Sequence, residues 1–391
     1  MLAAIRAVNT GGLSLVLVFM GIYLVTERGL SMTAYGLIAL AAHTGQSWTQ
    51  GFAGLLSDRV GRRPVMIAAL VIRSGVIAIL GALILADAPI WILAVIIVVS
   101  SSLRGAFEPV AYALVADVVK PSERVVAFGL QRMGTNAGWA IGPALGGALI
   151  AQTSYGAVFF FAAPALLVSA LLCLLLAEPE RGETVDAGPR TSVVGALRAA
   201  FADRDAAVFL FGAFLFAFCH VQLFATLSVY AKATLEMSHA EVGQGYMVNG
   251  VLVLLLQLPA VALITHLTNR VALVVGSVLY IASFLAFGHA AALFGIIVAV
   301  TILTIGEVIL APAQQAVVAE LSDPDKYGRA FGVMGTVQTL GVAISPLVGG
   351  IAFDLLGENG VAMWSTLALA PALMLAAFAW FARRMRSKLL S

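Results

Sequence analysis

Three ionisable residues stand in the middle of long apolar segments, where they could transfer protons or bind charged groups. Arg104 and Glu108 lie in the segment 91–118, and Glu307 lies in the segment 292–320. Burial favours the neutral form of a carboxylic acid. A carboxyl group that alternates between an arginine, a bound compound and water can therefore take up and release a proton. We predict that Glu307 and Glu108 transfer protons, with Arg104 as their modulator or as an anchor for an anionic group.

The same three residues also allow a purely structural interpretation. Glu108 follows Arg104 by one helical turn, so the two side chains can neutralise each other on one face of a helix. Glu307 has no opposite charge within reach on its own helix. A static charge bridge between helices is the main alternative to proton transfer, and exposure to lipid or in a loop is a third interpretation.

Three further ionisable residues lie inside apolar segments. His220 is central in the segment 206–231, where we expect a hydrogen-bonded cavity residue rather than a proton carrier. Arg73 and Arg132 lie about two turns from the ends of their segments, where a long arginine side chain can reach the membrane surface. We therefore expect structural roles for both arginines.

The composition shows what kind of chain must position these residues. Of 391 residues, 61% are hydrophobic and 11% are charged, and the mean hydropathy is +1.01. A membrane-spanning helix needs about 20 apolar residues, so roughly a dozen spans with short loops account for the chain and leave no room for a soluble catalytic domain. Continuously apolar runs such as LVSALLCLLLA exclude alternating membrane strands. The predicted fold class is an all-α membrane protein.

Clusters of charged residues, glycine and proline divide the chain into two sets of six spans. The one long polar connection, 178–205, predicts a cytoplasmic linker between two six-helix halves, 1–177 and 206–391. The predicted spans are 8–26, 34–56, 65–86, 91–118, 125–152, 156–177, 206–231, 241–266, 271–289, 292–320, 327–354 and 360–382.

The basic residues predict the orientation of the chain. Of its 22 Lys and Arg residues, 17 fall on one side of this arrangement, among them Arg6 just before the first span, whereas Arg28 and Lys232 fall on the other side. Cytoplasmic loops carry an excess of Lys and Arg, so both termini are predicted to be cytoplasmic, and the first helix is predicted to be uncleaved.

The two halves share a sequence repeat at an offset of 203 residues. The segment 108–129, EPVAYALVADVVKPSERVVAFG, aligns with 311–332, APAQQAVVAELSDPDKYGRAFG. Six spans repeated in the same topology predict parallel halves related by an axis along the membrane normal, with the functional site where they meet. Arg104 and Glu307 occupy equivalent positions in this repeat, so we expect them at the same depth on opposite walls.

A charged loop follows the second predicted span. GLLSDRVGRRPVM, 54–66, places one Asp and three Arg in thirteen residues. Asp58 is expected to accept hydrogen bonds from the free N–H groups at the start of the next span, and the glycines permit a tight turn. Positive-inside topology alone would explain only the arginines. We predict a clasp that holds one conformation and releases in another. The clasp residues are Gly54, Asp58, Arg59, Gly61, Arg62 and Arg63.

This loop resembles the signature loop between the second and third helices of the major facilitator superfamily. GWAIGPALGG, 138–147, in the fifth span resembles the Gly-Pro motif associated with antiporters of that superfamily. The resemblance covers the entire chain. It implies the major facilitator fold with twelve transmembrane helices, alternating access, and proton-coupled efflux of small amphipathic compounds or drugs. The residues that match the Gly-Pro motif are Gly138, Gly142, Pro143, Gly146 and Gly147.

The sequence departs from the drug antiporters of this superfamily in two places. The first span has no internal acidic residue, and the fourth span reads RGAFEP, 104–109, where those antiporters show Arg followed by a Gln-Gly pair. Proton-coupled symport of a sugar, peptide, metabolite or lipid-like molecule is therefore the nearest alternative.

Aromatic and amide residues on six of the spans, together with one histidine, are candidates for lining a substrate cavity. The alternative for the aromatic residues is packing or contact with lipid, which is commoner. The candidates are Tyr23, Gln46, Phe107, Tyr112, His220, Gln222, Phe224, Asn249, Gln257, Gln314 and Gln315.

Other classes of function lack their motifs. The sequence contains no Gly-Lys-Ser/Thr phosphate loop, no HExxH and no paired Cys/His ligand set. Cys173 and Cys219 both lie in apolar spans, where we expect them to pack. We therefore expect no enzyme activity, no cofactor and no metal, and a gradient as the energy source. A transporter fold used as a receptor or scaffold is a third class, which would leave the buried charges without a task.

These expectations together place the chain in a membrane with few partners. We expect a monomer that crosses the plasma membrane several times, the inner membrane in a bacterium. Its expected partners are a small-molecule substrate, protons and the lipid bilayer, and no nucleic acid.

Overall fold

The regular structure of the chain is entirely helical where it is described. The structure, a computed structural model, describes residues 1–120, 123–176, 178, 193–266, 268–322 and 327–390. Within these ranges the elements are helices and no strand occurs. In a hydrocarbon environment a helix satisfies its backbone polar groups internally, and the predicted all-α class is confirmed.

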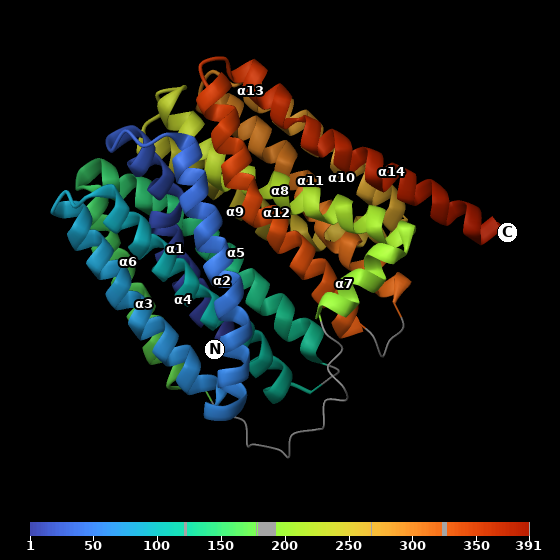
Figure 1. The fold of residues 1–391 in the computed structure, drawn as a ribbon, viewed down its shortest axis with the longest axis horizontal. Coiled ribbons are helices and arrows are strands. Elements are labelled where there is room, and N and C mark those ends of the chain that lie inside the picture. The colour runs from blue at the N-terminus through green and yellow to red at the C-terminus, as the bar shows by residue number, and fades with distance from the viewer. Residues whose placement is uncertain (121–122, 177, 179–192, 267, 323–326, 391) are drawn as a thin grey trace. The chain divides into compact units, whose positions relative to one another are not determined.

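The first six predicted spans appear as six long helices, blue to green in Figure 1. The first of them ends in one π-helical segment, η1, which contains Tyr23. Their bounds are α1 (Leu2–Ile22), η1 (Tyr23–Glu27), α2 (Met32–Val60), α3 (Arg62–Leu85), α4 (Ile90–Val118), α5 (Arg124–Gln152) and α6 (Tyr155–Cys173).

The second set of spans follows a short helix, α7. The last span is broken at Ala368, because Pro371 has no N–H group to donate to the carbonyl of Leu367. The bounds are α7 (Val193–Ala202), α8 (Arg204–Ala233), α9 (His239–His266), α10 (Asn269–His289), α11 (Leu293–Leu321), α12 (Tyr327–Leu356), α13 (Gly360–Leu367) and α14 (Leu369–Leu390).

The helix bounds confirm the repeat. Adding 203 to the bounds of α4 gives those of α11, and the bounds of α5 give those of α12 to within one residue. The predicted spans agree with the helices to a few residues. The main exceptions are the first span, which was predicted to begin at residue 8 and begins at Leu2, and the last, which was predicted to end at residue 382 and ends at Leu390.

Nine helical segments in the described ranges are long and apolar enough to cross a membrane. Two further helices, α2 and α5, have 29 residues each but are less apolar. Six glycines lower the hydropathy of α5, and polar residues lower that of α2. A further long helix, α9, has 28 residues.

The chain forms two compact units that differ from the two predicted halves. One unit comprises Met1–Arg181 and Leu227–Leu254, and the other comprises Gly182–Thr226 and Leu255–Ser391. The end of α8 and the first part of α9 therefore group with the N-terminal helices. Of the predicted linker, residues 179–192 lie outside the described ranges, and α7 forms part of the remainder.

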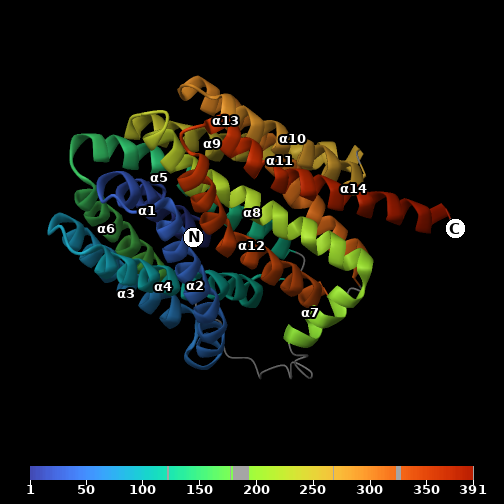
Figure 2. The same cartoon turned by 45° about the horizontal axis from the view of Figure 1, so that its top comes forward.

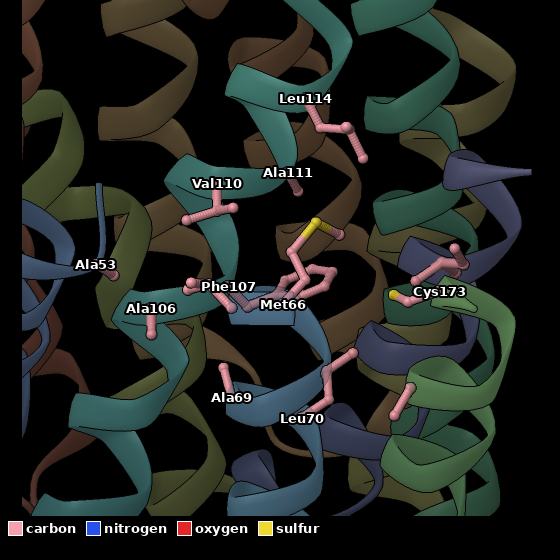
Figure 3. Packing of buried hydrophobic residues seen from close by; sticks show 13 residues of the cluster. Ala53, Met66, Ala69, Leu70, Ala106, Phe107, Val110, Ala111, Leu114 and Cys173 are labelled. Carbon is pink, nitrogen blue, oxygen red and sulfur yellow. The ribbon is translucent and has the colours of Figure 1, made fainter. Parts of the chain in front are cut away.

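An apolar cluster holds α3, α4 and α6 together in the first unit. Met66 and Leu70 of α3, Phe107 and Val110 of α4 and Cys173 of α6 all belong to this cluster (Figure 3). Phe107 is therefore packed in the core of this unit, and its role in lining a cavity stays a prediction. The predicted packing role of Cys173 is confirmed.

Glycines bring α1 and α5 into backbone contact. A side chain at Gly138, Gly142 or Gly146 would overlap atoms of α1. Ser14 of α1 donates a hydrogen bond to the Gly138 carbonyl at 3.0 Å. Small residues of this kind allow close approach of membrane helices.

The second unit has the equivalent contact between α8 and α12, which lie side by side in Figures 1 and 2. A side chain at Gly341, the counterpart of Gly138, would overlap the Phe214 carbonyl. Ser345 donates to the Phe218 carbonyl at 2.7 Å. Both repeats thus use a serine hydroxyl bonded to the carbonyl of the facing helix.

Gly146→Ala should destabilise the protein by about 1–3 kcal/mol, because the new methyl group meets backbone atoms of Leu15 that cannot move alone. Gly129→Ala on the same helix is the control, since a methyl group there meets no atom within 4 Å and should stabilise by about 0.5–1 kcal/mol. The midpoint of thermal unfolding in detergent measures both. Equal midpoints for the two variants would contradict the close contact of α1 and α5.

Candidate functional site

Glu108 forms a partly buried ion pair with an arginine of another helix. Arg6 of α1 donates from Nη1 to Glu108 Oε2 at 2.6 Å and from Nε to Gln131 Oε1 of α5 at 2.6 Å. Its guanidinium also lies 4.3 Å from the centre of the Tyr112 ring. The predicted pair of Glu108 with Arg104 is therefore wrong. The carboxylate is held by a charged donor from α1, which makes a short, charge-assisted bond.

The sequence signal for Arg6 was misinterpreted because of the first helix boundary. With a span beginning at residue 8, Arg6 was assigned to the inner surface, but α1 begins at Leu2 and buries this side chain. Gln131 was not considered at all. Arg6 and Gln131 are polar residues inside the apolar helices α1 and α5. This signal in the sequence would have identified them as possible partners.

Two further arginines lie near this ion pair. Arg73 of α3 is only 4% exposed, so the predicted extension of its side chain to the surface is wrong. It interacts electrostatically with Arg104 and Glu108. Arg104 is half-buried on α4 and forms no ion pair with any residue that the structure describes.

Glu307 faces a histidine in the second unit. Its Oε2 atom lies 3.9 Å from Nδ1 of His220, which comes from α8. The imidazole lies between two aromatic rings, with Phe216 at 6.1 Å and Phe224 at 5.4 Å between ring centres. Nδ1 of His220 is buried and has no hydrogen-bond partner in the described part of the chain. Glu307 and His220 are thus brought together, which the sequence did not predict.

Three of the predicted cavity residues form hydrogen bonds within the protein. Two of them join helices, and the third lies near the end of the first helix. Gln222 of α8 is fully buried and donates to the Ser345 carbonyl of α12 at 2.9 Å. Gln314 of α11 is buried and accepts from Gln338 of α12 at 3.3 Å. Tyr23 accepts from Arg28 at 2.9 Å, and this hydrogen bond raises the pKa of Arg28 above its usual value.

The remaining predicted cavity residues differ in burial. Asn249 is buried, whereas Gln315 is exposed on α11 and Tyr112 is exposed by 45%. Three are half-buried, namely Gln46, Phe224 and Gln257.

The charged loop between α2 and α3 forms a network around Arg62. This residue pairs with Asp58 at 2.6 Å and with Asp117, at the end of α4, at 2.9 Å. It also donates to Ser57 Oγ at 2.6 Å. Gly61 has φ of 116°, a conformation that favours glycine and allows the turn between the helices. The network ties the ends of α2, α3 and α4 together.

Another acid occupies the helix start that was assigned to Asp58. Glu178, which follows α6, accepts from the backbone N–H of Arg62 at 2.6 Å and of Arg63 at 2.9 Å. The prediction that Asp58 caps this helix is therefore wrong, because Asp58 lies within α2 and turns to Arg62. Gly54 meets no neighbouring atom within 4 Å, and Arg59 is exposed.

The second repeat has a neutral counterpart of this network. Asn269, at the start of α10, donates from its amide to Glu320 at the end of α11. Glu320 aligns with Asp117 under the offset of 203 residues. An amide here takes the place of the arginine of the first repeat, so among the residues that the structure describes the charged network occurs in the first repeat.

The Gly-Pro motif of α5 also contacts the start of α9. A side chain at Gly147 would overlap the His239 carbonyl, and one at Gly243 would overlap the Pro143 carbonyl. His239 Nε2 lies 2.6 Å from the hydroxyl of Tyr155, which begins α6. Sequence reasoning missed this pair because each residue lies at a helix end, where polar side chains are common.

A model of the Major Facilitator Superfamily matches residues 2–303 and, in a second match, residues 231–389. The two matches together cover almost the entire chain. The chain belongs to the major facilitator superfamily. It is therefore a transporter of this superfamily, and the predicted fold is confirmed.

Two transporters with similar sequences align with most of this chain. The chain is 27% identical over 352 residues to an uncharacterised MFS-type transporter, YqjV, of Bacillus subtilis, with 87% of this chain and 82% of YqjV covered. It is 26% identical over 307 residues to the multidrug resistance protein MdtH of Salmonella arizonae, with 78% and 73% covered.

Solved structures of the superfamily share the fold. A bacterial homologue of the human lysosomal transporter Spinster, in an inward-facing and occupied conformation, aligns with a TM-score of 0.77 at 17% identity, covering 98% of this chain and 95% of the homologue. Family membership implies a small-molecule substrate and a bilayer. No group of three or more potential metal ligands occurs among the described residues of this transporter.

Arg62→Gln should lower the midpoint of thermal unfolding by roughly 1–3 °C, because a partly exposed ion-pair network contributes up to about 1 kcal/mol. Adding Asp117→Asn should lower it little further, since both changes break the same bridge. Arg270→Gln, at the corresponding helix start of the second repeat, is the control because it forms no ion pair with the described residues. Additive losses from the first two changes would exclude the bridge.

Proposed function

We propose that this transporter exports small amphipathic compounds in exchange for protons, and that Glu307 takes up and releases the proton. Transport then proceeds by alternating access, with both termini in the cytoplasm. In this proposal a proton gradient across a bacterial inner membrane supplies the energy for transport. The proposed function includes no enzyme activity.

The arrangement of Glu307 and His220 carries the proposal. Glu307 is mostly buried, with 12% of its side chain exposed, and the imidazole of His220 lies near it. A carboxyl group and an imidazole can share one proton in a hydrogen bond between them. A transported compound that binds at either group would compete for that hydrogen bond, which is the behaviour required of a coupling site.

Glu108 is less suited to carry the proton. Its carboxylate is bonded to Arg6 at 2.6 Å. Separating a buried ion pair leaves an uncompensated charge, which costs several kcal/mol. The structure therefore favours a fixed pair at Glu108, and we assign the proton to Glu307 alone.

The direction of transport is supported by the Gly-Pro motif and by one relative. The motif resembles that of antiporters, and its glycines allow α5 to approach both α1 and the start of α9 closely. The name of MdtH describes a multidrug resistance protein. The network around Arg62 would hold one conformation and release in the other.

Purified protein in liposomes containing a pH-sensitive dye tests the proposal. Ethidium, octyl phosphate, lactose and dialanine serve as probes, and substrate movement is measured together with proton flux. Proton flux opposite to substrate movement is expected. Glu307→Gln should reduce the coupled flux by on the order of a hundredfold, the usual contribution of a positioned proton-transfer group.

Glu358→Gln is the matched control, because it makes the same change at an exposed residue between α12 and α13. This variant should retain full flux. Proton flux in the same direction as the substrate would make the protein a symporter. Unchanged coupled flux in Glu307→Gln would return Glu307 to a packing role.

A further inference from the structure

The buried polar cluster around Arg6 has more hydrogen-bond donors than acceptors. Three donor atoms are buried without a partner in the described part of the chain: Arg6 Nη2, Arg73 Nε and Gln131 Nε2. One acceptor, Asn9 Oδ1 on α1, is in the same state. A buried donor without an acceptor costs about 1–3 kcal/mol. These buried groups therefore present three unpaired donors against one unpaired acceptor.

The charges of the cluster are also unbalanced. Arg6, Arg73 and Arg104 come from α1, α3 and α4, and Glu108 is the only carboxylate paired with any of them among the described residues. Arg73 and Arg104 repel each other electrostatically. Three guanidinium groups against one carboxylate leave a formal charge of +2 in an apolar part of the protein. Charged groups inside a membrane are offset by an opposite charge, by backbone carbonyls or by water, and an anion that enters from the exposed side of this cluster would offset the surplus.

We propose that Arg6, Arg73 and Arg104, with the amide of Gln131, bind the phosphate or carboxylate group of the transported compound. An oxyanion supplies several acceptors to guanidinium groups, which bind it through paired, charge-assisted hydrogen bonds. It also offsets the surplus positive charge. The inference rests on the proposed function in one respect: it takes the anionic group to be part of the transported compound.

The site has an exposed side lined by aromatic rings. Tyr112 is exposed by 45%, and its ring lies 4.3 Å from the Arg6 guanidinium and 5.8 Å from the centre of the Phe128 ring. Arg104 is half-buried. A molecule can therefore place an anionic group at the arginines and an apolar part against Tyr112 and Phe128. This combination describes an anionic amphiphile.

Calorimetric titration of the purified protein, with protein-free micelles as the blank, tests the site. Octyl phosphate, inorganic phosphate and octyltrimethylammonium are the probes. Octyl phosphate should bind with saturation. Its dissociation constant should rise about tenfold in Arg73→Gln and in Arg104→Gln, the loss expected for one charge-assisted hydrogen bond. Arg132→Gln, at a half-buried arginine of α5 outside the cluster, should bind like the native protein.

Glu108→Gln separates a binding role from a structural one. Removing the competing carboxylate frees Arg6 and raises the formal charge of the cluster, so binding of octyl phosphate should become tighter. A structural disturbance would weaken it instead. Since Arg73 is fully buried, Arg73→Lys, which keeps the charge but not the paired donors, should bind with intermediate strength if the protein folds.

The two phosphate probes distinguish the source of the anion. Binding of either one that depends on Arg73 and Arg104 supports an oxyanion site; tighter binding of octyl phosphate identifies an amphiphile, and equal binding identifies a free anion. Binding of octyltrimethylammonium with equal strength, or phosphate binding unchanged in both arginine variants, would overturn the proposal. The titration uses no proton gradient, so its outcome is independent of whether export and proton coupling are found.

Discussion

The structure depends on one constraint: a polar group buried inside the membrane needs a hydrogen-bond partner that water does not supply. Some hydroxyls use a carbonyl of their own helix, as Ser277 does with Leu273, and other polar groups use a facing helix. Ser14 bonds the Gly138 carbonyl, Gln222 bonds the Ser345 carbonyl, and Arg6 bonds Glu108. Each of these contacts joins two helices that are far apart in sequence, so the polar residues determine which helices pack together.

The two repeats meet this constraint with the same backbone and different charges. α4 and α11 have corresponding bounds, and α5 and α12 both place small residues against the facing helix. The equivalent positions Arg104 and Glu307 nevertheless have opposite sign. The basic residue lies in a cluster with surplus donors, and the acidic residue lies beside an imidazole. Binding of an anion and transfer of a proton are therefore assigned to different repeats.

Much of the fold could be predicted from the sequence, because long apolar runs and a repeat at constant offset are properties of the sequence alone. The partners of the buried charges could not. Arg6 was placed outside the membrane by an error of six residues in the first helix start, and Glu108 was then paired with Arg104, its only neighbour on the same helix. Asp58 lost its expected capping role to Glu178, which is remote in sequence. Partners from other helices require tertiary contacts, which periodicity and local charge patterns do not contain.

The bond of Glu178 to the start of α3 bears on how the two repeats differ. The residue that corresponds to Glu178 in the second repeat is Phe381, which is buried against Phe209 and can accept no hydrogen bond. The two repeats therefore differ in kind at this position: an acid closes the start of α3 in one, and an apolar ring packs into the core in the other. The same backbone position thus anchors a neighbouring helix through a charge in one repeat and through packing in the other.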